Sequence, residues 1–467
     1  MHSKSNEAFV YSPNVFNSAV KFLNEIHKNE QYLIYYQQFF RNAISTDASS
    51  SSSPQWIHTR LSYENFAGFR PFTETEKFTH VLKTSFSIQI SPHWHVYSRM
   101  RATNEPSGLS YFTGKSIVKK RAGLKTAEFD YGFLRYSSNN WQLSFGRHRI
   151  TWGNYTTHAL LLSSTGPNWD GAYVKFNFLN FSYHFFAGYL ETVADNDENI
   201  NRYIGGHLLT YHYKNWYLGA GETIIYSGAN RAFDLSYIVP FVPFLESDAN
   251  LRFNQRVQEQ DNAFLFLGLE YRNHNNFRGF LHWLIDDIQI DPNDRKRIPD
   301  NTALSSGFQF QLLTLPFYDQ ISLSYERVGS WTYRYTRPFT NYQSRGLLLG
   351  TPNGSDFESW RLTNTMLFSK PVRVQLIATY VRRGEKDLKT DLFSLKDVTR
   401  KLPFPSGIVE STVQLQSWLT VFPRPGILIE LGLAYNHSQN YNHVSGTSHT
   451  DLSVGLHTEF SLGLTWD

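Results

Sequence analysis

Apolar and polar residues alternate along much of the chain, most clearly at its C-terminal end. Over residues 450–466 the odd positions are polar or small, among them Ser453, His457 and Glu459. The even positions of this stretch are nearly all apolar: Leu452, Val454, Leu456, Thr458, Phe460, Leu462, Leu464 and Trp466. Successive side chains of a β-strand point to opposite faces, so this period of two predicts a strand with one apolar and one polar face.

The length of these runs separates two classes of β protein. Leu82–Ile90, Val372–Tyr380 and Ile427–Tyr435 repeat the pattern, and with their flanks the runs reach about ten residues, which a tilted strand needs to cross a bilayer. Strands of soluble proteins are typically about 5–6 residues long. Alternation alone also fits a soluble sandwich, which is the alternative. The length of the runs, with aromatic residues near strand ends, predicts an all-β transmembrane barrel.

Strands and joins follow a regular plan along the chain. We predict about 18 antiparallel strands, at residues 55–66, 79–90, 93–101, 125–136, 140–150, 168–178, 181–190, 203–213, 215–226, 262–273, 276–288, 302–313, 318–326, 358–369, 371–382, 408–420, 426–436 and 450–466. The joins alternate between short turns, such as 214–215, and long loops, such as 227–261 and 383–407. Short periplasmic turns and long extracellular loops are the plan of outer-membrane barrels, and an even strand count places both termini in the periplasm.

Composition supports this fold and excludes others. The 467 residues include 37 Phe, 28 Tyr and 11 Trp, so 16% are aromatic, yet the mean hydropathy is −0.41. Disordered chains have few aromatic residues, and a membrane-spanning helix needs about 18 consecutive apolar residues, which the chain lacks. Because there is no Cys, disulfides and thiolate metal sites are excluded. A net charge of +4 is too small to indicate nucleic acid as a partner.

The first 54 residues follow a different pattern. Between Asn14 and Ile44, apolar residues recur at helical spacing, and Ser12 before Pro13 fits a helix start. We therefore predict two parts: residues 1–54 as a short N-terminal α-helical segment, periplasmic, and residues 55–467 as the outer-membrane β-barrel. The helical segment is predicted to plug the periplasmic mouth; the alternative is a small periplasmic dock for another protein.

A secretory signal is not visible at the start of this numbering. Met1–Val10 has no charged region followed by about 7–15 apolar residues. Either the signal lies outside this numbering, or the start is misplaced, or the outer-membrane localisation is wrong; we expect one of the first two.

The polar residues do not indicate catalysis. The sequence contains no G-x-S-x-G, H-E-x-x-H or P-loop motif, so we expect no enzyme activity, no cofactor and no metal site. The polar faces of the predicted strands carry charges of both signs: Lys83, Glu128, Asp130, Arg373, Glu430, His457 and Glu459. We expect these groups to form ion pairs across the inner wall; the alternative is the lining of a water-filled pore.

Two outer loops have contrasting compositions. The 227–261 loop contains nine consecutive residues, Tyr237 to Leu245, that are nearly all apolar. We expect this loop to fold inward and occlude the lumen through Tyr237, Phe241 and Phe244; contact with a partner is the alternative. Another loop carries the basic cluster Arg295–Arg297, which fits either a solvated surface or a contact with anionic sugars and lipopolysaccharide phosphates.

Residues 144–170 carry a resemblance to a known family. They read S-F-G-R-H-R-I-T-W-G-N-Y-T-T-H-A-L-L-L-S-S-T-G-P-N-W-D. This stretch resembles the capsule assembly (Wzi-like) family of outer-membrane barrels, Bacteroidetes branch, which has G-R-x-R-x-x-W-G, then L-L-L-S and a Pro-containing turn followed by Asp. Further similar stretches follow in the family's order: Glu222–Tyr226, the Pro-rich 240–243, Leu284–Gln289 and Leu349–Asp356.

The resemblance implies a non-enzymatic outer-membrane barrel whose outer surface binds or anchors capsular polysaccharide. Sugar attachment requires exposed aromatic faces beside polar donors. The candidates are Trp331, Tyr333, Arg334, Tyr335, Arg337, Arg147, Arg149 and Trp152. For Arg147, Arg149 and Trp152 a structural role at the rim is the alternative.

Three functions therefore stay open at this point. The first is polysaccharide anchoring, with capsular or other surface polysaccharide, outer-membrane lipid and lipopolysaccharide as partners. The second is a porin or solute channel. The third is a barrel subunit of a larger outer-membrane complex that docks other outer-membrane or periplasmic proteins through residues 1–54.

Overall fold

A computed structural model provides the structure of the chain. It describes residues 56–69, 77–105, 116–121, 123–152, 159–195, 198–237, 242–244, 261–273, 276–287, 300–314, 317–335, 338–368, 371–386, 388, 403–424 and 426–466. Residues 1–54 lie outside the described residues, so the helical segment and its periplasmic role stay predictions. Phe241, Arg337 and Arg295–Arg297 also lie outside them.

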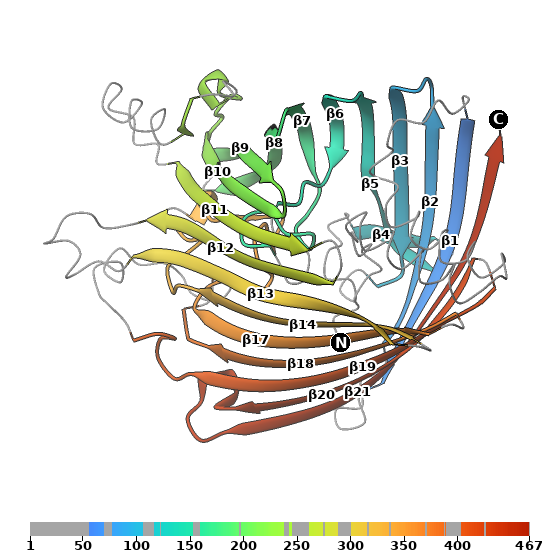
Figure 1. The fold of residues 1–467 in the computed structure, drawn as a ribbon, viewed down its shortest axis with the longest axis vertical. Coiled ribbons are helices and arrows are strands. Elements are labelled where there is room, and N and C mark those ends of the chain that lie inside the picture. The colour runs from blue at the N-terminus through green and yellow to red at the C-terminus, as the bar shows by residue number, and fades with distance from the viewer. Residues whose placement is uncertain are drawn as a thin grey trace, which may run out of the picture.

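Eighteen antiparallel strands form a closed ring (Figure 1). They are β1 (Trp56–Phe69), β2 (Lys77–Gln89), β3 (Trp94–Thr103), β5 (Leu124–Ser137), β6 (Trp141–His148), β7 (Trp169–Phe178), β8 (Phe181–Asp195), β9 (Glu198–Tyr213), β10 (Trp216–Ala229), β11 (Asn262–Asn273), β12 (Phe277–Asp287), β13 (Asn301–Thr314), β14 (Phe317–Val328), β17 (Phe357–Phe368), β18 (Val372–Arg383), β19 (Glu410–Arg424), β20 (Ile427–Gln439) and β21 (Ser448–Trp466). Each strand pairs with its neighbour in the ring, and β1 pairs with β21 from Ile57↔Trp466 to Phe69↔Val454. The predicted barrel and its strand number are confirmed.

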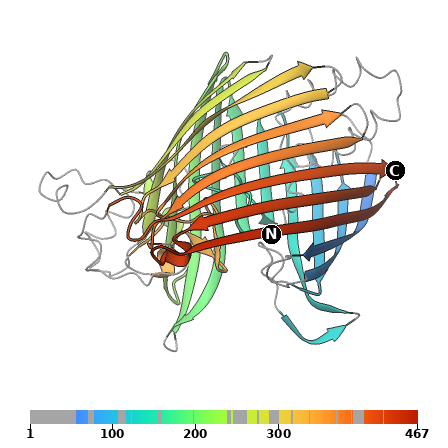
Figure 2. The ribbon, with the colours of Figure 1, turned by 90° about the horizontal axis from the view of Figure 1, so that it is seen from below.

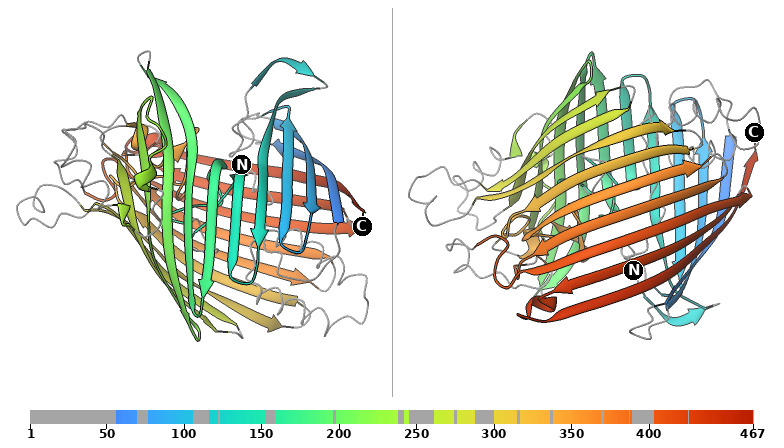
Figure 3. Two further views of the ribbon diagram at one scale, coloured as in Figure 1. Left: turned by 90° about the horizontal axis from the view of Figure 1, so that it is seen from above. Right: turned by 60° about the horizontal axis from the view of Figure 1, so that its bottom comes forward.

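The joins between strands also follow the predicted plan, with two differences. Short turns such as 179–180 and 214–215 lie at one end of the barrel, and loops such as 230–261 and 329–356 lie at the other. The stretch 191–202, predicted as a loop, is instead a continuation of β8 and β9, and this hairpin stands out beyond its neighbours (Figure 3). The long-loop end also carries short elements: β4 (Ser116–Arg121), which pairs with β5 (Figure 2), η2 (Leu235–Tyr237), η4 (Pro338–Thr340), β15 (Gln343–Ser344), β16 (Leu347–Leu348) and η5 (Tyr441–His443).

The alternating pattern sorts the side chains between the two faces of the wall. On β21, Leu456, Phe460 and Leu462 are exposed on the outside, whereas Ser453 and His457 are buried. An exposed apolar belt costs free energy in water but not in a bilayer, since lipid tails are apolar. No helix among the described residues has the length and apolar character that a membrane-spanning helix needs.

The charged side chains predicted to lie on the inner face form ion pairs, as expected. Lys83 Nζ lies 2.5 Å from Glu64 Oε1, and Arg373 Nη2 lies 3.1 Å from Glu430 Oε1. The other pairs on this face are Arg99–Asp130, Arg101–Glu128, Arg60–Glu459, Arg278–Glu270 and His457–Glu430. Each pair joins strands of the wall, so these charges compensate one another where the wall curves around the lumen.

Candidate functional site

Two loops enter the ring from its long-loop end and pack together inside it. We call their described residues, 149–152 with 159–168 and 329–335 with 338–356, the plug. Buried apolar side chains of the plug meet inward-facing residues of nine strands, β7 to β14 and β17, in one cluster. Side chains from nine strands of a closed ring can converge only in its interior. The members of this cluster from the strands are Trp169, Phe186, Leu190, Ile204, Leu208, Ile225, Phe264, Phe266, Leu284, Ala303, Val328 and Phe357.

The two plug loops are held to each other by direct contacts. The Tyr333 hydroxyl donates to the carbonyl of Leu160 at 2.5 Å, and the amide of Ser163 donates to the carbonyl of Leu349 at 2.7 Å. At Gly350 the loops come so close that a Cβ would lie 2.6 Å from the Leu160 oxygen. Only glycine fits there without displacing backbone, so this position fixes how the loops meet.

Arg202 of β9 attaches the second plug loop to the wall. Its guanidinium donates to the carbonyls of Phe339 at 2.5 Å, Asn341 at 2.9 Å and Gln343 at 2.7 Å. Its charge is balanced by Glu191 of β8 at 2.5 Å. Three backbone acceptors on one planar donor group define both the position and the orientation of this segment.

Asp356 anchors the other end of the same loop. This fully buried carboxylate accepts hydrogen bonds from the Ser330 hydroxyl at 2.6 Å and from the amides of Ser406 and Lys386, both at 3.0 Å. It therefore ties the 329–356 loop to the 384–409 loop. Its φ is 58°, in the left-handed region that Asn and Asp tolerate better than most residues.

Tyrosines inside the plug are uncharged. Burial raises the pKa of Tyr333 well above its ordinary value, with Glu326 adding to the effect, and burial likewise raises the pKa of Tyr342. The Tyr342 hydroxyl shares a hydrogen bond of 3.1 Å with the Thr223 hydroxyl on β10. Both phenols thus act as neutral hydrogen-bonding groups that lock the plug to the wall.

The structure places most of the predicted sugar-contacting residues inside this plug, which corrects that expectation. Trp331 is 3% exposed and Trp152 is 4% exposed, and Tyr333 and Arg334 are equally buried. Within the aromatic–basic run the Arg334 guanidinium lies 5.8 Å from the Trp331 ring centre, and the Lys386 ammonium of the 384–409 loop lies at the same distance from it. These side chains therefore cannot stack on a polymer in this conformation. Tyr335 is half-buried, with its amide donating to Asn341.

The described part of the loop expected to occlude the lumen lies on the other side of the wall. We call its described residues, 230–237 and 242–244, the outer strap. Tyr237 and Phe244 are buried in a cluster with Tyr203, Ile224 and Tyr226. Two neighbouring glycines of β9 identify the face: a Cβ on Gly206 would meet Phe186 and Thr223 of the interior, whereas a Cβ on Gly205 would meet Phe244. The strap thus covers the outer wall, and the prediction that Tyr237 and Phe244 occlude the lumen is wrong.

A carboxyl and an imidazole group on the outer wall explain what the strap covers. Glu222 and His207 are opposite one another on β10 and β9, 2.6 Å apart between Oε1 and Nε2. They share the outward face with the exposed Leu218 and Leu209. The Phe244 amide donates to Glu222 at 2.9 Å and its ring lies over His207. The strap therefore shields a carboxylate that would otherwise face lipid, which is costly.

Comparison with known proteins decides the family. A model of the family described as capsule assembly protein Wzi matches residues 71–452, most of the chain. The chain belongs to this capsule assembly (Wzi) family. As an 18-stranded barrel of this family it is an outer-membrane protein, so its long loops are extracellular and its short turns periplasmic.

Solved structures support the fold of this Wzi-family chain. It is similar to Wzi of Escherichia coli, described as an outer-membrane protein involved in group 1 capsule assembly and a carbohydrate-binding β-barrel, with a TM-score of 0.60 and 12% identity over 98% of this chain and 93% of that one. It is also similar to Pseudomonas aeruginosa OccD3 (OpdP), with a TM-score of 0.51 and 10% identity over 87% of this chain and 91% of that one. A sequence comparison with curated proteins gave no significant match.

The family motif of residues 146–170 has a structural role in this Wzi-family barrel. Arg147 of β6 and Asp170 of β7 form a two-pronged pair on the outer face, at 2.8 and 2.7 Å. Arg149 donates to the Asn168 side chain at 3.0 Å and to the carbonyl of Ser164. Both arginines thus fix the two ends of the first plug loop, which agrees with the alternative reading of a structural role at the rim.

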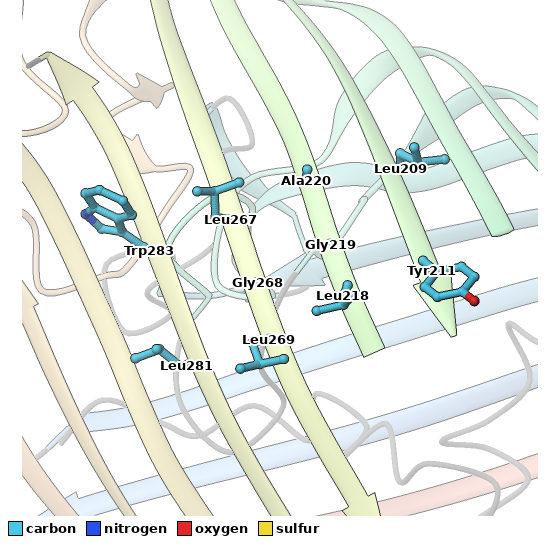
Figure 4. A pocket seen from close by; sticks show the side chains of 10 residues that line it. All are labelled: Leu209, Tyr211, Leu218, Gly219, Ala220, Leu267, Gly268, Leu269, Leu281 and Trp283. Carbon is cyan, nitrogen blue, oxygen red and sulfur yellow. The ribbon is translucent and has the colours of Figure 1, made fainter. Parts of the chain in front are cut away.

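An apolar groove lies below the strap on the outer wall of β9 to β12 (Figure 4). It encloses about 400 Å³ and is lined by Leu209, Tyr211, Leu218, Gly219, Ala220, Leu267, Gly268, Leu269, Leu281 and Trp283. The small side chain of Ala220, on the outward face of β10, leaves room between the larger side chains of Leu209, Leu218 and Leu267. The lining of the groove offers hydrocarbon contacts rather than the polar groups that sugars need, which fits the lipid-facing belt.

Proposed function

We propose that this Wzi-family barrel holds capsular polysaccharide at the cell surface and does so without catalysis. The observation that carries the proposal is the plug: two extracellular loops, tied to each other by Tyr333 and Leu160, place apolar side chains in the lumen against nine of the eighteen strands. Because the plug narrows the lumen with apolar side chains, it favours a role for the extracellular face over solute diffusion through the barrel. The E. coli relative, a carbohydrate-binding barrel, supports the same reading.

The plug also favours anchoring over the porin alternative. A pore requires a continuous wet path lined by polar groups. Here the aromatic rings of Phe264, Tyr333 and Tyr342 pack together within the path, and Tyr333 and Tyr342 are stacked with their ring centres 5.5 Å apart. Opening such a path would require the loss of this buried apolar contact, which costs several kcal/mol.

Further contacts belong to the same proposal. We propose that Tyr335, in the second plug loop, and Arg337, which lies outside the described residues, contact the bound polymer, and that lipopolysaccharide surrounds the barrel. We also place the chain in the Bacteroidetes branch of the family, on the G-R-x-R-x-x-W-G and L-L-L-S stretches of residues 146–163.

A deletion strain of the source organism tests the proposed function. Cells lacking the chain should release capsular polysaccharide into the medium, and the plasmid-encoded chain should restore its retention on the cells, as measured by quantifying sugar in the two fractions. In planar bilayers the purified chain should show no conductance above background. Full retention of capsule without the chain, or steady conductance, would contradict the proposal.

A further inference from the structure

A polar and aromatic surface lies on the outer side of the β8–β9 hairpin, away from the plug. We call Tyr189, Thr192, Asn201, Tyr203, Arg231 and Phe233 the rim cluster. On β9, Asn201 and Tyr203 share the outward face with Gly205, on which the strap rests. On β8, Tyr189 and Thr192 are opposite Tyr203 and Asn201. Arg231 and Phe233 come from the strap.

A β-bulge in β8 creates this arrangement. The register with β9 shifts between Tyr189 and Glu191, so that one extra residue lies between them. Glu191 consequently points inward to Arg202 of the wall, while Thr192 returns to the outward face. Bulges often re-aim side chains at functional positions. This one bulge affects both faces of the wall. On the inner face it turns Glu191 toward Arg202, which holds the plug, and on the outer face it brings the Thr192 hydroxyl beside Tyr189.

Hydrogen bonds connect the polar members of the cluster in a chain. The Tyr189 and Thr192 hydroxyls are 2.6 Å apart, and Thr192 donates to the Asn201 side-chain oxygen at 2.8 Å. The Asn201 side-chain nitrogen then donates to the Arg231 carbonyl at 2.9 Å. Thr192 is exposed, so its hydroxyl lies within reach of a ligand that offers hydroxyl groups of its own.

Aromatic rings pack beside these polar groups. Phe233 is 38% exposed, and its ring meets that of Tyr203 edge-on at 5.5 Å. Tyr203 in turn packs against Tyr189 and stacks on Tyr226 at 5.1 Å. Ring faces next to hydroxyl and amide groups form an amphipathic surface, with an apolar body and polar edges.

The cluster carries no uncompensated positive charge. Its one basic side chain, Arg231, contacts both carboxylate oxygens of Asp261 at 2.6 and 3.0 Å and Asp234 at 3.4 Å. A phosphate or a uronate would have to compete with two carboxylates for this guanidinium. The surface is therefore better matched to an uncharged ligand than to a lipid headgroup.

The position of the cluster along the barrel is also informative. Trp216, exposed at the periplasmic end of β10, marks the lower edge of the membrane, and a tilted strand crosses the apolar belt in about 9–11 residues. Tyr226 lies that far along β10 and so marks the upper edge. Asn201 pairs with Gly228, beyond this edge. The polar part of the rim cluster thus begins where the membrane ends.

We propose that the rim cluster binds uncharged pyranose units of the surface polysaccharide. The C–H face of a sugar ring would rest on Phe233, and its hydroxyl groups would exchange hydrogen bonds with Thr192 and Asn201. This proposal rests on the proposed function and adds to it a place, on the side of the barrel rather than over the plug, and a class of sugar.

The polysaccharide released by the deletion strain is the probe. It is measured by biolayer interferometry on the detergent-solubilised full chain, before and after chemical reduction of its carboxyl groups. Phe233→Ala should weaken binding about tenfold and Thr192→Val about threefold, while carboxyl reduction should leave binding unchanged. The matched control is Leu235→Ala, in the same strap and 73% exposed, which should bind like the wild type. Heat-modifiable migration on gels checks that each variant is folded.

The outcomes separate the two proposals. If wild-type binding is unaffected by F233A and T192V, or is lost on carboxyl reduction, the rim cluster is not the site, although anchoring by the chain stands. If L235A weakens binding as much as F233A, the surface is a general apolar contact and the assignment to sugar is overturned. If the deletion strain releases no polysaccharide, the proposed function itself fails.

Discussion

The plug, made of two extracellular loops, and the outer strap, part of a third, lie on opposite sides of one wall. Both are rich in aromatic residues, and both bury tyrosines, Tyr333 and Tyr342 in the plug and Tyr237 in the strap. The plug packs against inward side chains of nine strands, whereas the strap packs against outward side chains of β9 and β10. The apolar content of a loop therefore predicts that the loop will be buried, but it does not predict on which side of the wall.

The side that a loop takes depends on residues in the strands. The strap is bound by Glu222, which falls on the same outward face of β10 as Leu218. The plug is bound by Arg202 and Asp286, which fall on inward faces. Successive side chains of a strand point to opposite faces. Whether the anchoring residue stands at an inward or an outward position of its strand therefore determines whether the loop packs inside the barrel or on its outer wall.

The largest expected effect comes from removing a plug anchor. Asp356→Ala would leave the Ser330 hydroxyl and the Ser406 and Lys386 amides without their buried acceptor, at a cost of about 3–5 kcal/mol. We expect the loops to loosen, and conductance to appear in planar bilayers where the wild type shows none. Asp356→Asn keeps the shape and tolerates the left-handed backbone, so it is the milder control. A closed, fully stable D356A barrel would show that the plug does not depend on this group.

The matching change in the strap should not open the barrel. Phe244→Ala removes a fully buried ring from the outer cluster, at a cost of about 3 kcal/mol in strap docking. Because the strap can detach locally, we expect faster proteolysis within it but unchanged conductance and barrel unfolding. Leu235→Ala is the exposed control. Conductance in F244A would mean that the strap shapes the lumen, against its assignment to the outer wall.

A smaller effect is expected at the rim pair Arg147–Asp170. Arg147→Lys loses the two-pronged geometry but keeps the charge. Since both side chains are partly exposed, we expect a loss of about 0.5–1 kcal/mol, measured as a shift of the urea unfolding midpoint. Arg99→Lys changes the corresponding two-pronged pair with the buried Asp130 on the inner wall and should cost more. If the two substitutions lowered the free energy of unfolding equally, inner-wall ion pairs would not be more stabilising than outer ones.

The sequence predicts the wall much better than the loops. The alternation of side chains along each strand is a local signal, and it placed all 18 strands and the inward side of Lys83, Arg373 and Glu430. The site depends on partners far apart in the chain, such as Tyr333 with Leu160, which no local pattern connects. One usable signal was present for the strap: Glu222 on an apolar outward face needs a cover, and the next loop supplies it.

The pairing of β1 with β21 also has a consequence for how the protein is made. The strand that begins the ring is completed only by the one that ends it, through thirteen residue pairs from Ile57↔Trp466 to Phe69↔Val454. A nascent or truncated chain without its last segment would present two unpaired edges, each able to join a neighbouring chain. Closure of the ring must therefore wait until β21 has been exported, so it is a late event in assembly that depends on this last strand of the barrel.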